Sequence, residues 1–304
     1  MRFTIYQDSH VGGRKNNQDR LAYSYSRDVL LMVIADGMGG HARGEIAAEV
    51  TVNTITTRFQ QEAATGVLRR PREFLESAIN AAHRAIVAHA DRNDMLECPR
   101  TTVVACIIQK GRATWAHSGD SRLYLFRDGK LLTATEDHSR VQQLISAGVL
   151  TPAQAAVHPE RNKIYNCLGG VLPPGMTISD EIGLHVGDSL VLSTDGFWGP
   201  LDSANIATRL TQSDVLTLVP QLLDEAETKA GADSDNLSVI ALTWERQEDE
   251  PAAATVTSTD PVEGFTTSIR NTTQLPITGA EVVTDADIER AILEIQDALK
   301  KVSR

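Results

Sequence analysis

The sequence VLLMVIADGMGGH, residues 29–41, joins seven consecutive apolar residues to a glycine-rich segment that begins with Asp36. A strand with apolar side chains on both faces must be buried on both faces, so residues 29–35 predict a central strand. Glycine lets a backbone approach other groups closely. The stretch therefore predicts a carboxylate that is fixed at the edge of a buried core.

Three further aspartates stand beside predicted strands in the same way. Asp195 follows the apolar run 189–193, Asp120 lies between two predicted strands, and Asp235 precedes the last strand. Taken singly, each is an ordinary turn residue. Carboxylates gathered at one end of a core repel one another, so either they are scattered or a cation lies among them. Carboxylate oxygens are the preferred ligands of Mg²⁺ and Mn²⁺.

Arg14 lies in the polar loop GGRKNNQDR, residues 12–20, after the first predicted strand. A guanidinium near a metal cluster binds a phosphoryl group through two parallel hydrogen bonds. Alone, the loop is more typical of a solvated turn.

The apolar runs predict an α+β fold. Strands and helices come in clusters and do not alternate, which favours antiparallel sheets covered by helices. Asp-Gly at 128–129 predicts a hairpin. Helical periodicity covers 42–59, 73–92, 138–147 and 213–229, the last interrupted or restarted at Pro220. The predicted strands are 3–7, 21–25, 29–35, 102–109, 113–117, 123–127, 189–193 and 237–244.

Composition excludes several classes of protein. The 304 residues hold 29 basic and 40 acidic side chains, a net charge of −11, which disfavours nucleic acid and anionic lipid as partners. The cysteines are three and form no Cys-x-x-Cys pair, which argues against a disulfide framework and favours a reducing compartment. The N-terminus has no signal-type apolar stretch. We expect a cytoplasmic protein without a membrane partner.

The chain divides by composition into three parts. Residues 1–245 predict one folded domain, and residues 246–283, rich in acids, Thr, Ala and Pro, predict a flexible linker. Residues 284–304 predict an amphipathic helix, because Ile288, Ile292 and Ile295 recur at helical spacing. This helix docks on the main domain, self-associates or binds a partner.

In their order along the chain, the motifs resemble the metal-dependent protein phosphatase family (PPM, the 2C-type Ser/Thr phosphatases) in its bacterial form. The resemblance covers about residues 3–245. The motifs are RKNNQD, ADGMGGH, TT before a strand, GDSR, TDG, and DN before the last strand. Each is short, whereas the ordered set is specific. It implies a four-layer α-β-β-α sandwich with a dinuclear Mn²⁺ or Mg²⁺ site between two antiparallel sheets.

The resemblance also implies roles for individual residues. Asp36 resembles the carboxylate that bridges the two metals, and Gly37 offers its carbonyl to the second metal. Asp195 and Asp235 resemble the remaining carboxylates of the first metal. Arg14 resembles the arginine that binds phosphate. The implied reaction is hydrolysis of phosphate monoesters in phosphoproteins by a metal-activated water, opposing a bacterial Ser/Thr kinase.

Other residues depart from the family pattern or carry lesser roles. Asp19 resembles the acid of the first motif, and Asn236 lies beside the ligands. Gln18 stands where many relatives have Glu, so the second metal is expected to bind less tightly. Gly199 stands where the family often has Asp, which puts in doubt a third metal site and Asp120 as its ligand.

Two rival interpretations remain. Gln18 and Gly199 keep open a catalytically weak pseudophosphatase that acts as a partner-binding regulatory module. Cys106 and Arg112 fit the Cys-x5-Arg pattern of thiol phosphatases, although Cys106 lies in a predicted buried strand and is more typical of a core residue.

The segment 138–170 resembles the family's variable flap beside the active site. Arg161 and Lys163 within it are candidates for steering a phosphoprotein. A solvated helical loop is an equally good interpretation of this segment.

Overall fold

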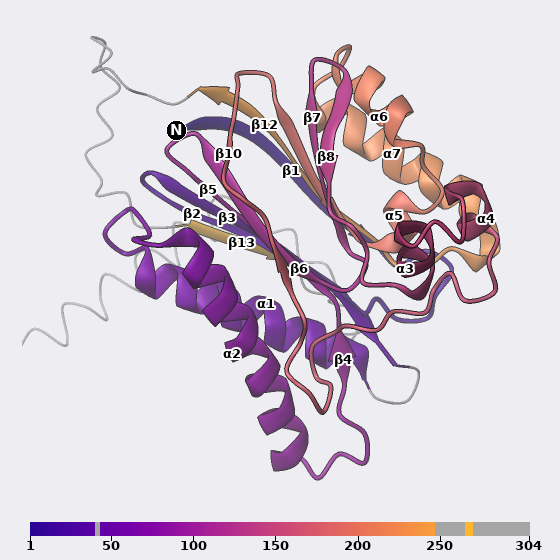
Figure 1. The fold of residues 1–304 in the computed structure, drawn as a ribbon. Helices are drawn as coiled ribbons and strands as arrows, with labels where there is room; N and C mark the ends of the chain where they lie inside the picture. The colour runs from indigo at the N-terminus through magenta and orange to yellow at the C-terminus, as the bar shows by residue number, and fades with distance from the viewer. Residues whose placement is uncertain (40–42, 247–264, 270–304) are drawn as a thin grey trace, which may run out of the picture. The chain divides into compact units, whose positions relative to one another are not determined.

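The computed structural model describes residues 1–39, 43–246 and 265–269, which form two antiparallel sheets that pack face to face (Figure 1). The five-stranded sheet has the order β1 (Arg2–His10), β12 (Leu237–Arg246), β11 (Ser189–Ser193), β7 (Arg122–Arg127) and β8 (Lys130–Ala134). The eight-stranded sheet has the order β10 (Ile182–Gly183), β6 (Arg112–Ser118), β5 (Val103–Gln109), β3 (Val29–Met38), β2 (Asp19–Ser26) and β13 (Phe265–Ile269). It also includes two short strands, β4 (Arg100–Thr101) beside β3 and β9 (Thr177–Ile178) beside β6.

Helices cover the outer face of each sheet (Figure 1). The eight-stranded sheet packs against α1 (Gly44–Glu62) and α2 (Pro71–Arg92). The five-stranded sheet packs against α5 (Asp195–Trp198), α6 (Ser203–Leu210) and α7 (Val215–Ala230), which a 3-10 turn (Gly231–Asp233) follows. Two short helices, α3 (Arg140–Ser146) and α4 (Pro152–Ala156), lie between β8 and β9 in the chain. These layers are the expected α-β-β-α sandwich.

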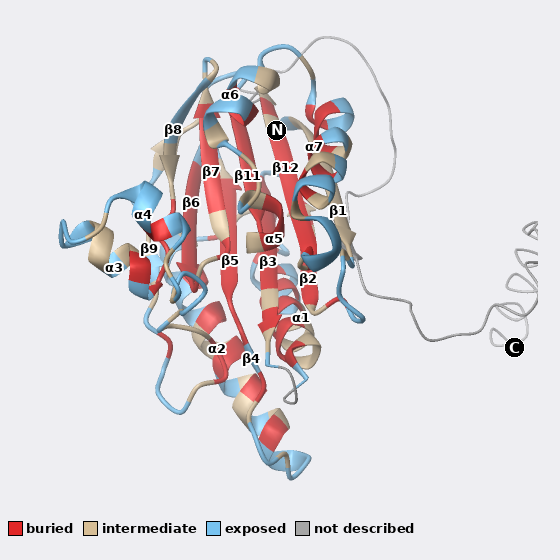
Figure 2. Ribbon diagram, turned by 90° about the vertical axis from the view of Figure 1, so that its right-hand side faces the viewer, coloured by how far each residue is buried: buried red, intermediate tan, exposed pale blue. Residues whose placement is uncertain are grey.

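The apolar strand β3 joins two of the cores. Leu30, Met32 and Ile34 pack between the sheets, while Leu31 and Val33 pack against α1 and α2. All five side chains are fully buried, and Figure 2 shows the central strands buried along most of their length. The prediction of a strand buried on both faces is therefore confirmed.

The predicted strands and the four main helices are present, as is the Asp-Gly hairpin. Asp128 and Gly129 both have positive φ, at 49° and 71°, as a two-residue hairpin turn requires. The sequence did not predict β8, whose first three residues are exposed and lack an alternating pattern. The predicted interruption at Pro220 is wrong, because α7 continues through it. The lost bond would have reached the carbonyl of Leu216, a half-exposed residue in the first turn, where the loss is tolerated.

Residues 265–269 form a strand inside the range that was predicted as linker. The backbone of β13 pairs antiparallel with β2, from Phe265 opposite Tyr25 to Ile269 opposite Leu21. The rest of the predicted linker, 247–264 and 270–283, and the predicted helix 284–304 lie outside the described residues. Within the described part, we find no helix with the length and apolar character that a membrane crossing requires.

A buried ion pair fixes the end of the five-stranded sheet away from Asp195. Arg127 on β7 binds both carboxylate oxygens of Asp188, at 2.8 and 2.6 Å, and the Asp188 side chain is 1% exposed. Removing one partner leaves the other charge buried without compensation, so we expect Arg127→Ala to lower the free energy of unfolding by about 3 kcal/mol.

Urea unfolding followed by tryptophan fluorescence measures this loss. The matched control is Arg112→Ala, which removes a half-exposed ion pair with Glu181 and is expected to cost less than about 1 kcal/mol. Equal losses in the two variants would contradict the assignment of Arg127 as the structural partner of the buried Asp188 carboxylate.

Candidate active site

One pocket of about 400 Å³ collects most of the predicted site residues. We call it the carboxylate pocket, and the predicted residues that line it are Arg14, Asp36, Gly37, Asp120, Asp195, Asp235 and Asn236. Asp19 does not line the pocket. It is 3% exposed and stands opposite Asp36 in the β2–β3 register.

Asp36 is held at the end of β3 by the two threonines of the TT motif. Its carbonyl accepts hydrogen bonds from the Thr101 hydroxyl and the Thr102 N–H, both at 2.8 Å, and its N–H donates to the Thr102 hydroxyl. Gly37 follows, where a Cβ would lie 2.3 Å from the carbonyl of Gly44. Glycine is therefore required at Gly37 for α1 to begin so close to the strand end.

Asp195 is the first residue of α5, on the opposite sheet. The hydroxyl of the residue before it, Thr194, donates a hydrogen bond of 2.8 Å to Asp19 Oδ2 and so links the two sheets. The other oxygen of Asp19, Oδ1, is buried and has no hydrogen-bond partner among the described residues. A buried carboxylate oxygen without a partner is costly, which points to a missing cation or proton.

The loop that carries Asp120 is clamped to α5. Trp198 Nε1 donates to the Asp120 carbonyl at 3.1 Å, and the Arg122 guanidinium stacks on the Trp198 ring at 3.4 Å. Arg122 also binds both oxygens of Asp137. The arginine of the GDSR motif therefore positions Asp120 and Asp195 relative to each other from outside the pocket.

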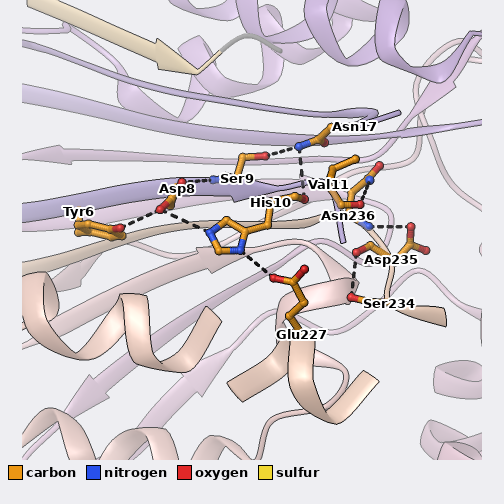
Figure 3. A network of polar contacts seen from close by, with 10 residues as sticks. All are labelled: Tyr6, Asp8, Ser9, His10, Val11, Asn17, Glu227, Ser234, Asp235 and Asn236. Carbon is orange, nitrogen blue, oxygen red and sulfur yellow. Dashed lines mark hydrogen bonds and ion pairs between the residues drawn. The ribbon is translucent and has the colours of Figure 1, made fainter. Parts of the chain in front are cut away.

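The loop that carries Arg14 is fixed by the Asn236 side chain. Its amide donates to the carbonyls of Val11 at 2.8 Å and Asn16 at 3.0 Å, and its oxygen accepts from the Gln18 N–H at 2.8 Å. Figure 3 shows Asn236 beside Val11. All three bonds go to the backbone, so the structure places Asn236 as the residue that shapes this loop.

A second polar network ties the start of the same loop to α7 (Figure 3). His10 Nδ1 lies 3.1 Å from Glu227 Oε2, and His10 Nε2 lies 3.7 Å from Asp8 Oδ2. Asn17 donates to the Ser9 hydroxyl at 2.7 Å. The loop between His10 and Asn17 is therefore anchored at both ends.

Burial and mutual repulsion change the protonation of the carboxyl groups. Burial raises the pKa of Asp19 to about 7, and burial together with repulsion by Asp195 raises the pKa of Asp120 to about 8. Burial together with repulsion by Asp235 raises the pKa of Asp195 to about 6. Burial raises the pKa of Asp36 well above its usual value, and repulsion by Asp19 and Asp195 adds to this effect. Burial is thus the largest cause of each raised pKa, and neighbouring acids add to it.

The donor set fits a hard divalent cation. Several carboxylates that repel one another, with a buried oxygen lacking a partner, gain most from a positive ion between them. Among the described residues, no three His, Cys, Asp or Glu side chains already converge on one point. Arg14 instead forms an ion pair of 2.7 Å with Asp235. A cation that used Asp235 as a ligand would therefore have to compete with Arg14 for its carboxylate.

Comparisons with known proteins agree with this donor set. A family model described as protein phosphatase 2C matches residues 6–233. The chain belongs to the protein phosphatase 2C family.

PstP, a serine/threonine protein phosphatase of Mycobacterium tuberculosis, is 33% identical over 228 residues, which are 75% of this chain and 42% of PstP. The chain thus spans less than half of PstP. The structure of the PstP catalytic domain with two manganese ions is 30% identical, with a TM-score of 0.67, and covers 79% of this chain and 97% of that chain. The structure of the Streptococcus agalactiae serine/threonine phosphatase is 32% identical, with a TM-score of 0.69. The match covers 80% of the present chain and 100% of the Streptococcus agalactiae chain.

Family membership confirms the main predictions. The predicted family, the two-sheet α+β fold, the metal-dependent Ser/Thr phosphatase activity and the Mn²⁺ or Mg²⁺ cofactor are all those of this phosphatase 2C family. The thiol rival is wrong, since Cys106 is fully buried in β5 opposite Trp115 and burial raises the pKa of its thiol. Arg112 is on β6, paired with Gln109 and therefore away from Cys106.

The structure adds pocket residues that the sequence did not indicate. Asn162 and Ile164 of the segment 138–170 line the carboxylate pocket, as does Lys15. The sequence pointed instead to the charges on either side of Asn162. Of these, Lys163 binds Glu160 at 3.1 Å. An amide and an apolar side chain in an irregular segment carry no signal in composition or periodicity, and only the fold shows that they reach the pocket.

The raised carboxyl pKa values predict an inverted pH dependence for the metal-free protein. A carboxyl that holds its proton more tightly when folded loses that advantage as pH rises toward its folded pKa. Stability then falls by about 1.4 kcal/mol per pH unit for each proton that only the folded state holds. In EDTA, we expect the Tm to fall between about pH 4 and 8, from the ordinary carboxyl pKa up to the raised pKa values of Asp19 and Asp120, and to level off above that range.

Thermal unfolding in EDTA across this range, repeated with Mn²⁺, measures the effect. Mn²⁺ is expected to abolish the fall, and the Asp19→Asn, Asp120→Asn double variant to flatten it in EDTA. Asp180→Asn, at a fully exposed side chain, serves as the control. A Tm in EDTA that stays level or rises with pH would contradict the raised pKa values that burial gives Asp19 and Asp120.

Proposed function

We propose that this chain removes phosphate from phosphoserine and phosphothreonine in proteins, and that the carboxylate pocket performs the hydrolysis. The observation that supports it most is the set of carboxyl groups, Asp19, Asp36, Asp120 and Asp195, whose pKa values are raised by burial and by neighbouring acids and which come from both sheets to one pocket. No purely structural role accounts for so many acids in one place, because each destabilises the others. Family membership supplies the reaction that uses such a site.

In this proposal Asp36, the Gly37 carbonyl, Asp195 and Asp235 would hold two divalent cations, with Asp36 as the carboxylate that would be shared between them. When bound, the cations supply a water activated for attack and neutralise the phosphate. Asp36 suits the bridging role because its backbone is fixed by Thr101 and Thr102. Asp195 and Asp235 reach the pocket from the opposite sheet and its adjoining loop.

Arg14 is proposed to hold the non-reacting phosphate oxygens. Its guanidinium already lies at the pocket, paired with Asp235. A cation on Asp235 weakens that pair and frees donors of Arg14 for phosphate, so metal loading and phosphate binding favour each other.

Three residues receive supporting roles. Asp19, behind the pocket, balances charge and holds Thr194, and Asn236 holds the Arg14 loop. Gln18 donates its amide to Glu45 Oε2 at 3.1 Å, so a carboxylate of α1 lies next to the position where relatives carry Glu. Asp120 remains the candidate ligand for an additional, weaker cation.

The comparisons favour the enzyme over the pseudophosphatase alternative, since the relatives are named as phosphatases and one contains two manganese ions. We further propose that the protein works in the cytoplasm and opposes a Ser/Thr kinase. The acidic balance of −11 supports a protein substrate over nucleic acid. The linker and the C-terminal helix remain proposals, and we propose that this helix docks on the main domain or on a partner.

The activity is tested with Mn²⁺ on p-nitrophenyl phosphate and on a phosphothreonine peptide. We expect turnover that EDTA abolishes and iodoacetamide spares, because Cys106 is buried and takes no part. The Asp36→Ala, Asp195→Ala double variant is expected to lose at least about 100-fold in kcat. Wild-type turnover no higher than that of the double variant would contradict the enzyme and restore the pseudophosphatase.

The phosphate-binding role of Arg14 has a separate test. Arg14→Ala is expected to lower kcat/KM for the phosphothreonine peptide by about 100-fold, and Arg14→Lys to recover only part of it, since an ammonium lacks the two-pronged geometry. Isothermal titration with Mn²⁺ is the control. Binding by Arg14→Ala should be unchanged or tighter, because Asp235 loses a competing partner. Weaker Mn²⁺ binding would assign Arg14 to the metal site instead.

A further inference from the structure

A second hollow opens beside the carboxylate pocket. It has a volume of about 970 Å³, in the range of ligand-binding clefts. The C-terminal half of α2, the loop after α2 and the segment from Ile164 to Val171 form it, and we call it the apolar groove. Met38, Gly39 and Ile164 line both hollows, so the groove adjoins the pocket.

The groove exposes large apolar side chains from two separate segments. Leu96, in the loop after α2, is 104% exposed, and Val171 is 98% exposed. These are the two most exposed large apolar side chains in the part of the chain that the structure describes. Apolar surface that gathers in a hollow beside an active site marks a place where another chain binds.

We propose that the apolar groove binds the substrate polypeptide on one side of its phosphorylated residue and selects a large apolar side chain there. The proposal rests on the phosphatase function proposed above, since it places the phosphate in the carboxylate pocket. The flanking chain then has to leave over the rim of that pocket. On one side the rim is polar, at Lys15 and Asn16, and at Met38 and Ile164 it leads into the groove.

Charge in the groove supports selection by shape and apolar contact. Arg84 and Arg100 are matched by Asp91 and Glu97, so neither sign dominates the lining. A substrate gains little there from a flanking charge. An apolar side chain instead gains by covering Leu96 and its neighbours from water, an effect that grows with the area covered.

The experiment uses the full-length chain with Mn²⁺ and phosphothreonine peptides of alanine background. A single leucine is moved through three positions on each side of the phosphothreonine. We expect leucine at one or two positions, on one side only, to lower KM by about tenfold, because the groove leaves the pocket in one direction. The Leu96→Ser, Val171→Ser double variant should lose this preference and keep wild-type turnover of p-nitrophenyl phosphate. Both side chains are almost fully exposed, so their replacement leaves the core intact.

Val186→Ser is the matched control, since Val186 is 74% exposed and lies in the loop before β11, outside the groove. It should retain the leucine preference. A preference that survives in the double variant, or its absence from the wild type while p-nitrophenyl phosphate is turned over, would overturn the proposal. A preference that appears only after removal of residues 270–304 would also overturn it, by making the protein's own tail the occupant. A wild-type protein that does not turn over p-nitrophenyl phosphate would instead refute the proposed phosphatase function.

Discussion

The β2–β3 ladder holds Asp19 and Asp36 opposite each other at the end of the eight-stranded sheet, where burial raises the pKa of both carboxyl groups. Both strands continue into a buried core, so the ladder fixes the backbone positions from which the two carboxylates extend. The carbonyl of Asp36 is held further by Thr101 and Thr102. A rigid pair of buried like charges is stable only with a proton or a cation between them.

The sandwich places the second half of the site directly across from the first. Thr194, directly after β11, donates a hydrogen bond from its hydroxyl to Asp19, and the next residue is Asp195. The two sheets therefore meet at the pocket through a hydrogen bond between a hydroxyl and a carboxylate. The packing of the two sheets therefore determines the geometry of the acids, because any slip between the sheets would change the distance between Asp36 and Asp195.

Sequence reasoning succeeded where one physical signal dominated. The unbroken apolar run 29–35 has no stable place except between two layers, and its register then fixes Asp36. The ordered motifs added the family, and with it the other acids. The predicted acids and Arg14 meet at the pocket, and Asp19 lies behind it.

Prediction from the sequence failed where tertiary contacts overrode the local structural preference of the residues. α7 passes through Pro220 because its buried face packs on the five-stranded sheet, a gain that no propensity scale contains. β8 is an edge strand whose pairing with β7 follows from the hairpin and not from its own pattern. The ion pair between Arg14 and Asp235 joins residues 221 positions apart, and only the folded loops bring them together.

The net charge of −11 acquires a different meaning from this geometry. An acidic chain is unsuited to a phosphate substrate unless its field is reversed locally. In the structure, the guanidinium of Arg14 at the pocket is neutralised by Asp235, and the pocket's other acids make its own field negative. The formal charge counts these acids and omits any bound ion, and two divalent cations bound among them would add four positive charges. In the proposed function, a cation held by Asp235 would also loosen Arg14 from that carboxylate. The acidity of the pocket would then make anion binding conditional on metal, because without cations the negative field of the pocket repels a phosphate.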